Sequence, residues 1–518
     1  MRKIYIILMF LCSASFARIF AGEEVSGALF YIKQIDFEIT GRTKWQALQK
    51  AGSFKIGEEI SDLESLNAYI KNKTQTLLNN RGLSEAAIEY TIGEAENGGR
   101  QAVYLRVFTV DTRNFIVLPE PKFSSNGGFE PAVKIRDYNF LGTMTPLKVD
   151  IGYTLDEFHL NDSSKGKYSL QAETSYPFQA FGLFWNFNFA IGLSYVAGEA
   201  LSFNNITGLS LDIPVKQTTL SFGFDQGTVI QEEYYLFEKD HHAEIFEDIQ
   251  YMYSKLYGRW KIPLGITIPG SGELVFTPEI AGKINYRLGG ADLSWRNGPI
   301  LIFDNKIGFE KINWLGNFRE GTSVQLGNKE EYNVHFDEWN NSIELGAIAH
   351  KKLSSFAGIS GRIRYKQWFN PAGHYHDKDR DEAANMLRGI VDRSIFANYM
   401  LSLNLDFPFH VFTAMPSVWF NNSNFSYFDF ELFLSPILDM AFVNGTLLDT
   451  HGKTLEDLSF SPSDFLVSGG FEMIVFPLSW RSVFMRFSVA LNIKELCETG
   501  AFPSGNNREI YIGIGHQY

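Results

Sequence analysis

Long stretches of this chain alternate apolar and polar residues, which is the period of a β-strand whose two faces meet different surroundings. In Leu183 to Val196 every odd position is large and apolar, whereas Asn186 and Gly192 stand among the polar or small residues between them. We expect such strands to be apolar on one side and wet on the other. Comparable runs are Leu147 to Thr154, Leu274 to Tyr286, Ala397 to Phe409 and Val483 to Ile493.

A soluble β-sandwich also alternates, and no single strand separates the two folds. Run lengths near ten residues and the lack of a second apolar face favour strands that cross a membrane. We therefore predict a transmembrane antiparallel β-barrel over residues 118–518. At about 25 residues for each strand with its connection, that stretch holds roughly 16 strands.

The ending of the chain supports a barrel. Apolar residues alternate towards a final aromatic residue, which is similar to the terminal signal by which outer-membrane barrels are recognised for assembly. His516 interrupts the apolar series, and a tyrosine stands where phenylalanine is commoner. The residues of this signal are Ile510, Ile512, Ile514 and Tyr518.

The start of the chain has the pattern of a secretory signal peptide, predicted here as residues 1–21. Arg2 and Lys3 precede an apolar run from Ile4 to Leu11, and small residues follow. Cys12 lies in the apolar core of this leader, so the mature chain would keep only Cys497 and form no internal disulfide. No later stretch approaches the roughly 18 apolar residues of a membrane helix.

Composition agrees with an exported barrel. Aromatic residues make up 15% of the chain and glycines number 45, as expected of strands that face lipid on one side only. The net charge is −13, and removal of the leader with its three cations makes it more acidic. This acidity argues against nucleic acid as a partner.

Residues 30–111 predict a small α/β domain in the order strand, helix, helix, strand, strand. Tyr31 to Ile39 alternates as a strand, a helix is expected after Ser61, and two strands meet at the turn from Glu96 to Gly99. Element order alone fits other small α/β domains equally well. Phe115 to Pro121 follows as a short connection bounded by proline.

An arginine and an aspartate stand out in the second half of the chain. Leu387-Arg388-Gly389-Ile390 lies in a loop before the strand that begins at Ala397, and Asp439 interrupts an apolar strand. A carboxylate there is cheaper in a polar lumen than in lipid, and a guanidinium can pair with it through two parallel hydrogen bonds. We expect the loop to fold into the barrel and Arg388 to meet Asp439, although a solvated loop arginine would also fit the sequence.

These residues resemble the BamA/TamA family of outer-membrane assembly and secretion barrels. In that family an aliphatic-Arg-Gly-aromatic loop tip pairs with an aspartate in a later strand. Ile390 departs from the family aromatic residue, and Ile437 and Ala441 replace an aromatic residue and a glycine. The turn after the first barrel strand is matched by Asn139, Phe140, Leu141 and Gly142, and the α/β domain is similar to one POTRA domain.

The resemblance implies a barrel in the outer membrane of a diderm bacterium, with the POTRA-like domain in the periplasm. Its partners would be outer-membrane lipids and unfolded outer-membrane or secreted client proteins. It leaves open whether periplasmic or lipoprotein subunits attach. The implied function is insertion or translocation of clients at a labile seam between the first and last strands. A passive diffusion pore and a surface adhesin or antigen are the alternatives.

The sequence offers no carrier of catalysis. Gly358-Ile359-Ser360-Gly361 lacks the spacing of a nucleophile elbow, and neither a phosphate-binding loop nor zinc-type cysteine pairs occur. We therefore expect no enzyme activity, no cofactor and no metal site. The stretch from His374 to Glu382 and the pair His241-His242 are rich in possible ligands, but they have the pattern of solvated loops.

Overall fold

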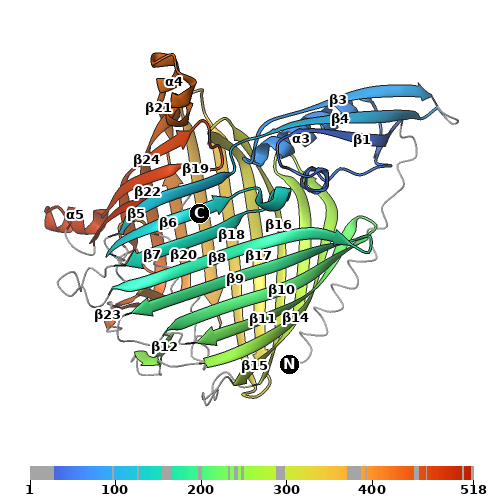
Figure 1. The fold of residues 1–518 in the computed structure, drawn as a ribbon. Coiled ribbons are helices and arrows are strands. Elements are labelled where there is room, and N and C mark those ends of the chain that lie inside the picture. The colour runs from blue at the N-terminus through green and yellow to red at the C-terminus, as the bar shows by residue number, and fades with distance from the viewer. Residues whose placement is uncertain are drawn as a thin grey trace.

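The computed structural model describes residues 29–95, 99–124, 128–154, 166–196, 201–230, 234–237, 243–246, 250–287, 298–369, 387–390, 394–448, 454–462, 464–503 and 507–514. Within these ranges the chain forms a small α/β sheet followed by a large closed barrel (Figure 1). The predicted leader, the two histidine-rich stretches and Tyr518 lie outside the described residues.

The α/β domain is a four-stranded sheet in the order β2-β1-β4-β3, in which β1 and β4 run parallel. Its core lies between the sheet and α3, where Ile32, Leu66 and Val107 are fully buried. Asp62 begins α3, because its side chain accepts a hydrogen bond from the backbone N–H of Ser65 at 2.7 Å. The elements are β1 (Phe30–Thr40), α2 (Trp45–Ala51), β2 (Glu59–Ile60), α3 (Leu63–Asn79), β3 (Leu83–Ala95) and β4 (Gln101–Asp111).

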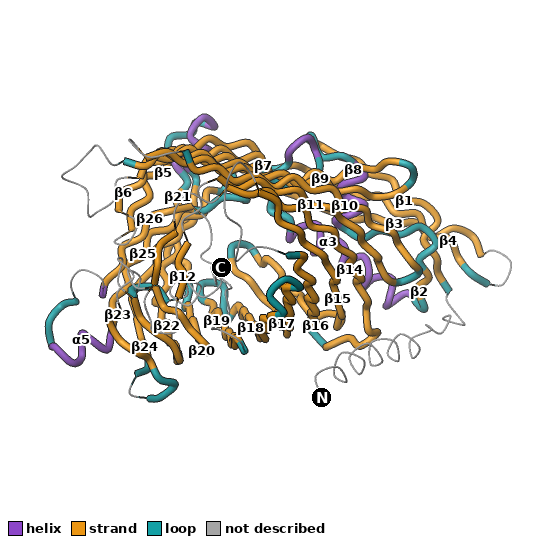
Figure 2. The backbone as a smooth tube through the Cα atoms, turned by 90° about the horizontal axis from the view of Figure 1, so that it is seen from below, coloured by secondary structure: helices purple, strands orange, loops and turns teal. Residues whose placement is uncertain are grey.

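Within the described residues, twenty antiparallel strand segments close into a barrel. Figure 2 shows the strands from below, arranged around the lumen. Its first half comprises β5 (Phe115–Ser124), β6 (Gly128–Asp137), β7 (Leu147–Thr154), β8 (Lys167–Ala180), β9 (Leu183–Val196), β10 (Ser202–Val215), β11 (Thr218–Ile230), β14 (Gln250–Ile268), β15 (Gly272–Arg287) and β16 (Pro299–Leu315). A separate hairpin joins β12 (Tyr234–Phe237) to β13 (Ala243–Phe246).

The second half of the barrel comprises β17 (Phe318–Asn333), β18 (Glu338–Lys352), β19 (Gly358–Trp368), β20 (Ser394–Asp406), β21 (Phe409–Ala414), β22 (Phe430–Leu448), β23 (Thr454–Leu458), β24 (Leu466–Pro477), β25 (Met485–Asn492) and β26 (Arg508–Ile514). Short helical segments lie between strands: η1 (Phe140–Gly142), α4 (Pro416–Trp419), η6 (Ser423–Phe428) and α5 (Ile493–Thr499).

The predicted class is confirmed, but the strand number is about 18 rather than 16. Segments β20 and β21 follow one another along β22, as β23 and β24 do, so each pair counts as one strand. Tight turns explain the larger number. Phe181 and Gly182 both have positive φ between β8 and β9, as a two-residue hairpin turn requires, and so short a turn leaves residues for further strands.

The outer face of the barrel is apolar along rows that cross several strands. Cross-strand partners Phe187, Leu209, Phe224 and Leu256 are 36%, 42%, 47% and 66% exposed on β9, β10, β11 and β14. The next residue along β11, Asp225, is paired in register with Lys255, so charged residues occupy the opposite, lumenal face. This arrangement is the apolar-out, polar-in alternation of a membrane barrel.

The prolines of the segment from Phe115 to Pro121 led us to predict a connection, and this prediction is wrong. The segment forms most of the first barrel strand, β5. Pro119 and Pro121 are tolerated because β5 pairs fully only with β6, so it behaves as an edge strand. The turn Asn139–Gly142 consequently follows the second barrel strand, β6, rather than the first.

None of the helices in the described ranges combines the length and apolar character that crossing a membrane requires.

Candidate functional site

The loop tip Leu387–Ile390 lies inside the barrel, and Arg388 is 2% exposed. Its Nε donates to Asp439 Oδ2 at 2.8 Å and its Nη2 donates to Asp439 Oδ1 at 2.6 Å. These two parallel bonds form the bidentate arrangement that a planar guanidinium favours. The structure therefore brings the two sequence-derived residues together as a buried ion pair.

Two backbone N–H groups of the loop tip also donate to carboxylates. The N–H of Arg388 donates to Asp439 Oδ2 at 2.9 Å, and the N–H of Gly389 donates to Glu509 Oε2 at 3.0 Å. Gly389 has φ +87°, and a Cβ there would lie 2.8 Å from the backbone of Ala490. Only glycine fits this position, because the backbone is left-handed and pressed against β25.

Sequence reasoning missed the other charges of this cluster. Asp406 Oδ1 lies 2.8 Å from Arg388 Nη1, and Glu472 Oε2 lies 3.8 Å from the same nitrogen. Arg486 Nε lies 3.2 Å from Glu472 Oε2. Each of these acids stands at a polar position of a strand in which apolar and polar residues alternate, as every other lumen-facing residue does. Only the register between the strands of the closed barrel shows that they converge on Arg388. We call Arg388, Asp406, Asp439, Glu472, Arg486 and Glu509 the lumenal charge cluster.

The lumenal charge cluster gathers one side of the barrel around the loop tip. Its acids come from β20, β22, β24 and β26, so one arginine and its glycine neighbour connect four strands. Leu387 and Ile390 flank the arginine and are buried in an apolar group. Ile390 belongs to the same apolar group as Trp368. The group is Trp368, Leu387, Ile390, Ala397, Met400, Ala441, Val443 and Leu458.

The turn Asn139–Gly142 connects the barrel to the α/β domain. Asn139 is 1% exposed, and its Nδ2 donates to Thr43 Oγ1 at 2.7 Å and to Asp111 Oδ2 at 3.2 Å. The carbonyl of Gly142 accepts a hydrogen bond from the N–H of Lys44 at 2.9 Å. Gly142 has φ +78°, and a Cβ there would lie 2.3 Å from the carbonyl oxygen of Arg42. The two small residues of the motif thus hold the domain directly against the barrel.

The rest of the motif lies outside this contact. Phe140 packs edge-on against Tyr176 of β8 at 6.5 Å between ring centroids, and Leu141 is 56% exposed with φ +52°. The side chains of Phe140 and Leu141 therefore do not take part in the hydrogen bonds to the domain.

Further contacts join the domain to the turn between β16 and β17 and to the stretch before β25. The guanidinium of Arg81 stacks 4.3 Å from the Trp314 ring and donates to Asn317 Oδ1 at 2.8 Å. Arg481, before β25, donates to the carbonyl of Ser84 at 2.7 Å. Burial, and then the nearby charge of Arg481, lower the pKa of Arg81 to about 10, so it stays charged at neutral pH. The α/β domain is thus held at three separate places on the barrel: the turn after β6, the turn between β16 and β17, and the stretch before β25.

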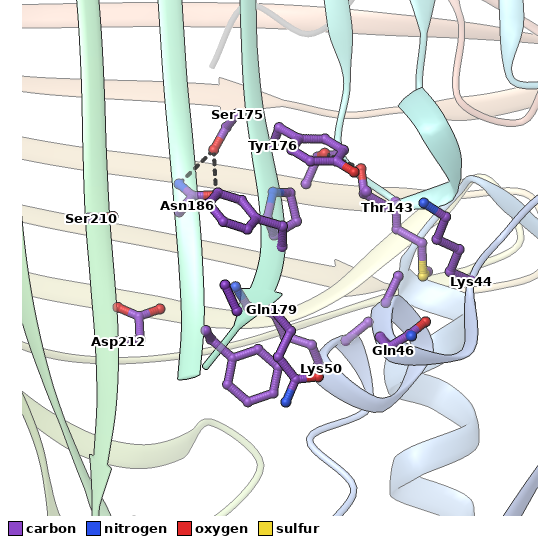
Figure 3. A pocket seen from close by; sticks show the side chains of 18 of the residues that line it. Lys44, Gln46, Lys50, Thr143, Ser175, Tyr176, Gln179, Asn186, Ser210 and Asp212 are labelled. Atoms are coloured by element: carbon purple, nitrogen blue, oxygen red, sulfur yellow. Dashed lines mark hydrogen bonds between the residues drawn. The ribbon is translucent and has the colours of Figure 1, made fainter. Parts of the chain in front are cut away.

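A cavity of about 790 Å³ lies between the α/β domain and the rim (Figure 3). Lys44, Gln46 and Lys50 reach it from the side of α2, and Tyr176 and Gln179 reach it from β8. On the barrel wall Asn186 Nδ2 donates to Ser175 Oγ at 2.8 Å. The lining therefore mixes polar and apolar side chains, with Lys44 and Lys50 on the domain side and Arg259 on the barrel side.

The first and last barrel strands meet at a weak junction. Among the described residues, β26 and β5 share one registered pair, Ile512 with Phe123, and we call this junction the seam. The strand pairings on either side of the seam are much longer. β5 and β6 share the pairs from Phe115–Asp137 to Ser124–Gly128, and β25 and β26 share those from Met485–Ile514 to Leu491–Arg508.

The residues of the predicted C-terminal signal fall on this last strand. Ile512 is 37% exposed on the outer face, and Ile510 pairs in register with Val489 of β25. Ile514 ends β26, and Tyr518 lies beyond the described residues. Recognition of this terminus by an assembly factor stays a prediction.

No protein-family model and no curated protein sequence matches this chain. Solved structures do match. The chain is similar to BamA and CdiB barrels. BamA from Haemophilus ducreyi lacking POTRA domains 1–3 is 14% identical, with 95% of this chain and 85% of that chain covered and a TM-score of 0.37.

CdiB from Acinetobacter baumannii is 12% identical, with 94% and 74% covered and a TM-score of 0.47. CdiB from Escherichia coli is 11% identical, with 95% and 91% covered and a TM-score of 0.38.

Proposed function

We propose that this chain is an outer-membrane barrel that inserts or translocates client proteins by pairing client strands at its seam. The observation that carries the proposal is the single registered pair between β26 and β5 within the described residues. A barrel normally satisfies all its backbone groups by closing completely. A seam this short leaves strand edges that another chain can pair with.

The physical basis is the cost of unpaired backbone groups in lipid. Each unsatisfied N–H or C=O in the hydrocarbon region costs several kcal/mol. A client hairpin that pairs with β26 or β5 forms hydrogen bonds to its backbone N–H and C=O groups before it enters lipid. No catalytic group is needed, since the barrel edge acts as a template.

The lumenal charge cluster supports this mechanism by holding the last strand from inside. Glu509 of β26 accepts the N–H of Gly389, while Asp439 of β22 holds Arg388. We propose that this clasp keeps β26 in place when the seam opens, so that only the side facing β5 is released. The role is structural and involves no bond-making chemistry.

We propose that the α/β domain is a POTRA-like module in the periplasm that receives clients. The sheet order leaves β3 at an edge, and β2 covers only Phe30 and Tyr31 of β1 at the other edge. An extended client segment can add to such an edge by main-chain hydrogen bonds. The cavity between the domain and β8 offers space for a segment near the barrel opening.

A passive diffusion pore is the weaker alternative, because side chains cross the barrel near the domain end. Phe318 of β17 and Phe433 of β22 have ring centroids 5.1 Å apart, although three strands separate them in the wall. Asn317 Nδ2 also donates to Glu431 Oε2 at 2.8 Å. Together with the buried loop tip, these contacts narrow the lumen.

The experiment is a reversible lock across the seam. In a Cys497→Ser background, Phe123→Cys with Ile512→Cys places thiols on registered partners. Oxidation should abolish assembly of a urea-denatured outer-membrane protein into proteoliposomes, and reductant should restore it. A matched lock inside the wall, Val489→Cys with Ile510→Cys, should leave assembly unchanged when oxidised. Undiminished assembly with a fully oxidised seam would exclude the proposed mechanism.

A further inference from the structure

The segment between β21 and β22 carries an unusual set of exposed apolar side chains. Val418, Trp419, Phe420 and Phe428 are 67%, 65%, 65% and 64% exposed. From Met415 to Phe428 the sequence contains no charged residue. We call Met415, Val418, Trp419, Phe420, Phe425 and Phe428 the aromatic plate.

The aromatic plate is a built structure. Phe425 packs against Phe420 and Phe428, with ring centroids 5.0 Å and 6.3 Å apart. Asp429 closes the segment by accepting the N–H of Ser417 at 3.0 Å and the hydroxyl of Ser417 at 2.5 Å. Ser417 and Asp429 therefore satisfy each other, while the apolar side chains of the plate remain exposed.

The plate is also fixed to the rim of the barrel. The Tyr427 and Trp480 rings are tilted to one another with centroids 5.7 Å apart, and the guanidinium of Arg113 lies 3.8 Å from the Tyr427 ring centroid. Arg113 belongs to the linker between the α/β domain and β5, so the plate lies at the domain end of the barrel, as Figure 1 shows for α4.

The apolar outer face of the barrel continues into the plate. A row of registered partners, 36–42% exposed, runs across the wall from beneath the plate to the seam. Phe412, three residues after Phe409 along β21 and nearer the plate, is 45% exposed, and its ring centroid lies 6.0 Å from that of Phe430. The row is Phe409 (β21), Leu434 (β22), Met473 (β24), Phe487 (β25) and Ile512 (β26).

We propose that the aromatic plate lies in the headgroup and upper acyl region of the leaflet on the domain side, as an interfacial anchor beside the seam. Tryptophan favours this region, since its ring is apolar with one polar N–H, and phenylalanine side chains beside it bury in the adjoining acyl boundary. The lack of charge and the continuity with the lipid-facing row select lipid over a protein partner. The inference rests on the membrane-spanning barrel of the proposed function, but not on client insertion.

Nitroxide labels test the proposal in proteoliposomes. In the Cys497→Ser background, Val418→Cys and Phe420→Cys are labelled one at a time, and their accessibilities to oxygen and to a water-soluble nickel chelate are measured. Labels on the plate should be reached by oxygen much more than by nickel. Ile56→Cys, in the α/β domain and also 67% exposed, is the water-facing control. Leu209→Cys, in the outer row of β10, is the lipid-facing control.

The controls separate the possible failures. Lipid contact at residue 209 with free nickel access at residues 418 and 420 would overturn the anchor and leave the barrel intact. Nickel access at all of these positions would refute the membrane-spanning barrel itself. Spin broadening at residue 418 that disappears on dilution with unlabelled protein would show a second copy on the plate and also overturn the anchor.

Discussion

Arg388 is a charge buried far from bulk water, and burial of a lone guanidinium would cost several kcal/mol. It is stable inside the barrel because every direction of the fork meets an acceptor: Asp439 takes two nitrogens and Asp406 takes a third. The acids in turn need the arginine, since four carboxylates share this part of the lumen with only one other cation in the cluster, Arg486. Burying the arginine without the carboxylates, or the carboxylates without the arginine, would therefore destabilise the barrel.

Replacement of Arg388 by alanine should strongly destabilise the barrel. Removing one partner of a buried ion pair costs about 3–5 kcal/mol, because the other charges are left uncompensated. The folded barrel should lose its resistance to SDS at a clearly lower temperature in a gel-shift assay. The double variant Arg388→Ala with Asp439→Asn should recover part of this loss. Wild-type heat resistance in the single variant would show that the pair contributes nothing.

Gly389→Ala should also destabilise the barrel, for a different reason. An alanine there combines left-handed backbone, worth about 1–2 kcal/mol, with a Cβ 2.8 Å from the Ala490 backbone. Gly500 is the matched control, since its φ is +64° but nothing lies within 4 Å of the place that a methyl group would occupy. Gly500→Ala should therefore be milder in the same gel-shift assay. Equal effects would mean that the close approach to β25 is unimportant.

At the scale of elements, the turn after β6, the end of β16 and the stretch before β25 hold the α/β domain over the barrel. The turn contributes Asn139 and Gly142, the stretch before β25 contributes Arg481, and the end of β16 contributes Trp314. These contacts involve few apolar side chains and many hydrogen bonds. The domain is thus positioned by directional bonds, which a single substitution can weaken.

Asn139→Ala should loosen the domain without unfolding the barrel. The substitution removes donors to Thr43 and Asp111 in a buried setting, which costs about 1–3 kcal/mol. Hydrogen exchange in α2 should become faster, while exchange in the barrel strands stays unchanged. Gln34→Ala, at an exposed position of β1, is the control that should change neither. Unaltered exchange in α2 of the Asn139 variant would argue against this clamp.

At the scale of the whole molecule, alternation was enough to predict a barrel, because lipid and lumen impose the period of two on every strand. It was insufficient for the strand number, since turns as short as Phe181-Gly182 are invisible to an average length. Alternation also failed to predict β5, because the prolines in this strand indicated a connection instead. Arg388 and Asp439 could be paired from sequence because each was unusual in its own segment.

The remaining charges could not be found in this way. Glu472 and Glu509 occupy polar positions like many others along the wall, and their convergence depends on the register of β24 to β26. Register is a property of the closed sheet and not of any one strand. The weakness of the seam is likewise a relation between two strands nearly 400 residues apart in the chain.

The central claim, that clients pair at the seam, is tested most directly by crosslinking in living cells. A photoreactive phenylalanine analogue at Ile512 should capture newly exported outer-membrane proteins, and the same analogue at Phe224, on the outer face of β11, should capture none. Client adducts at the seam position alone are the predicted result. No adducts at residue 512, or equal adducts at both positions, would contradict the account.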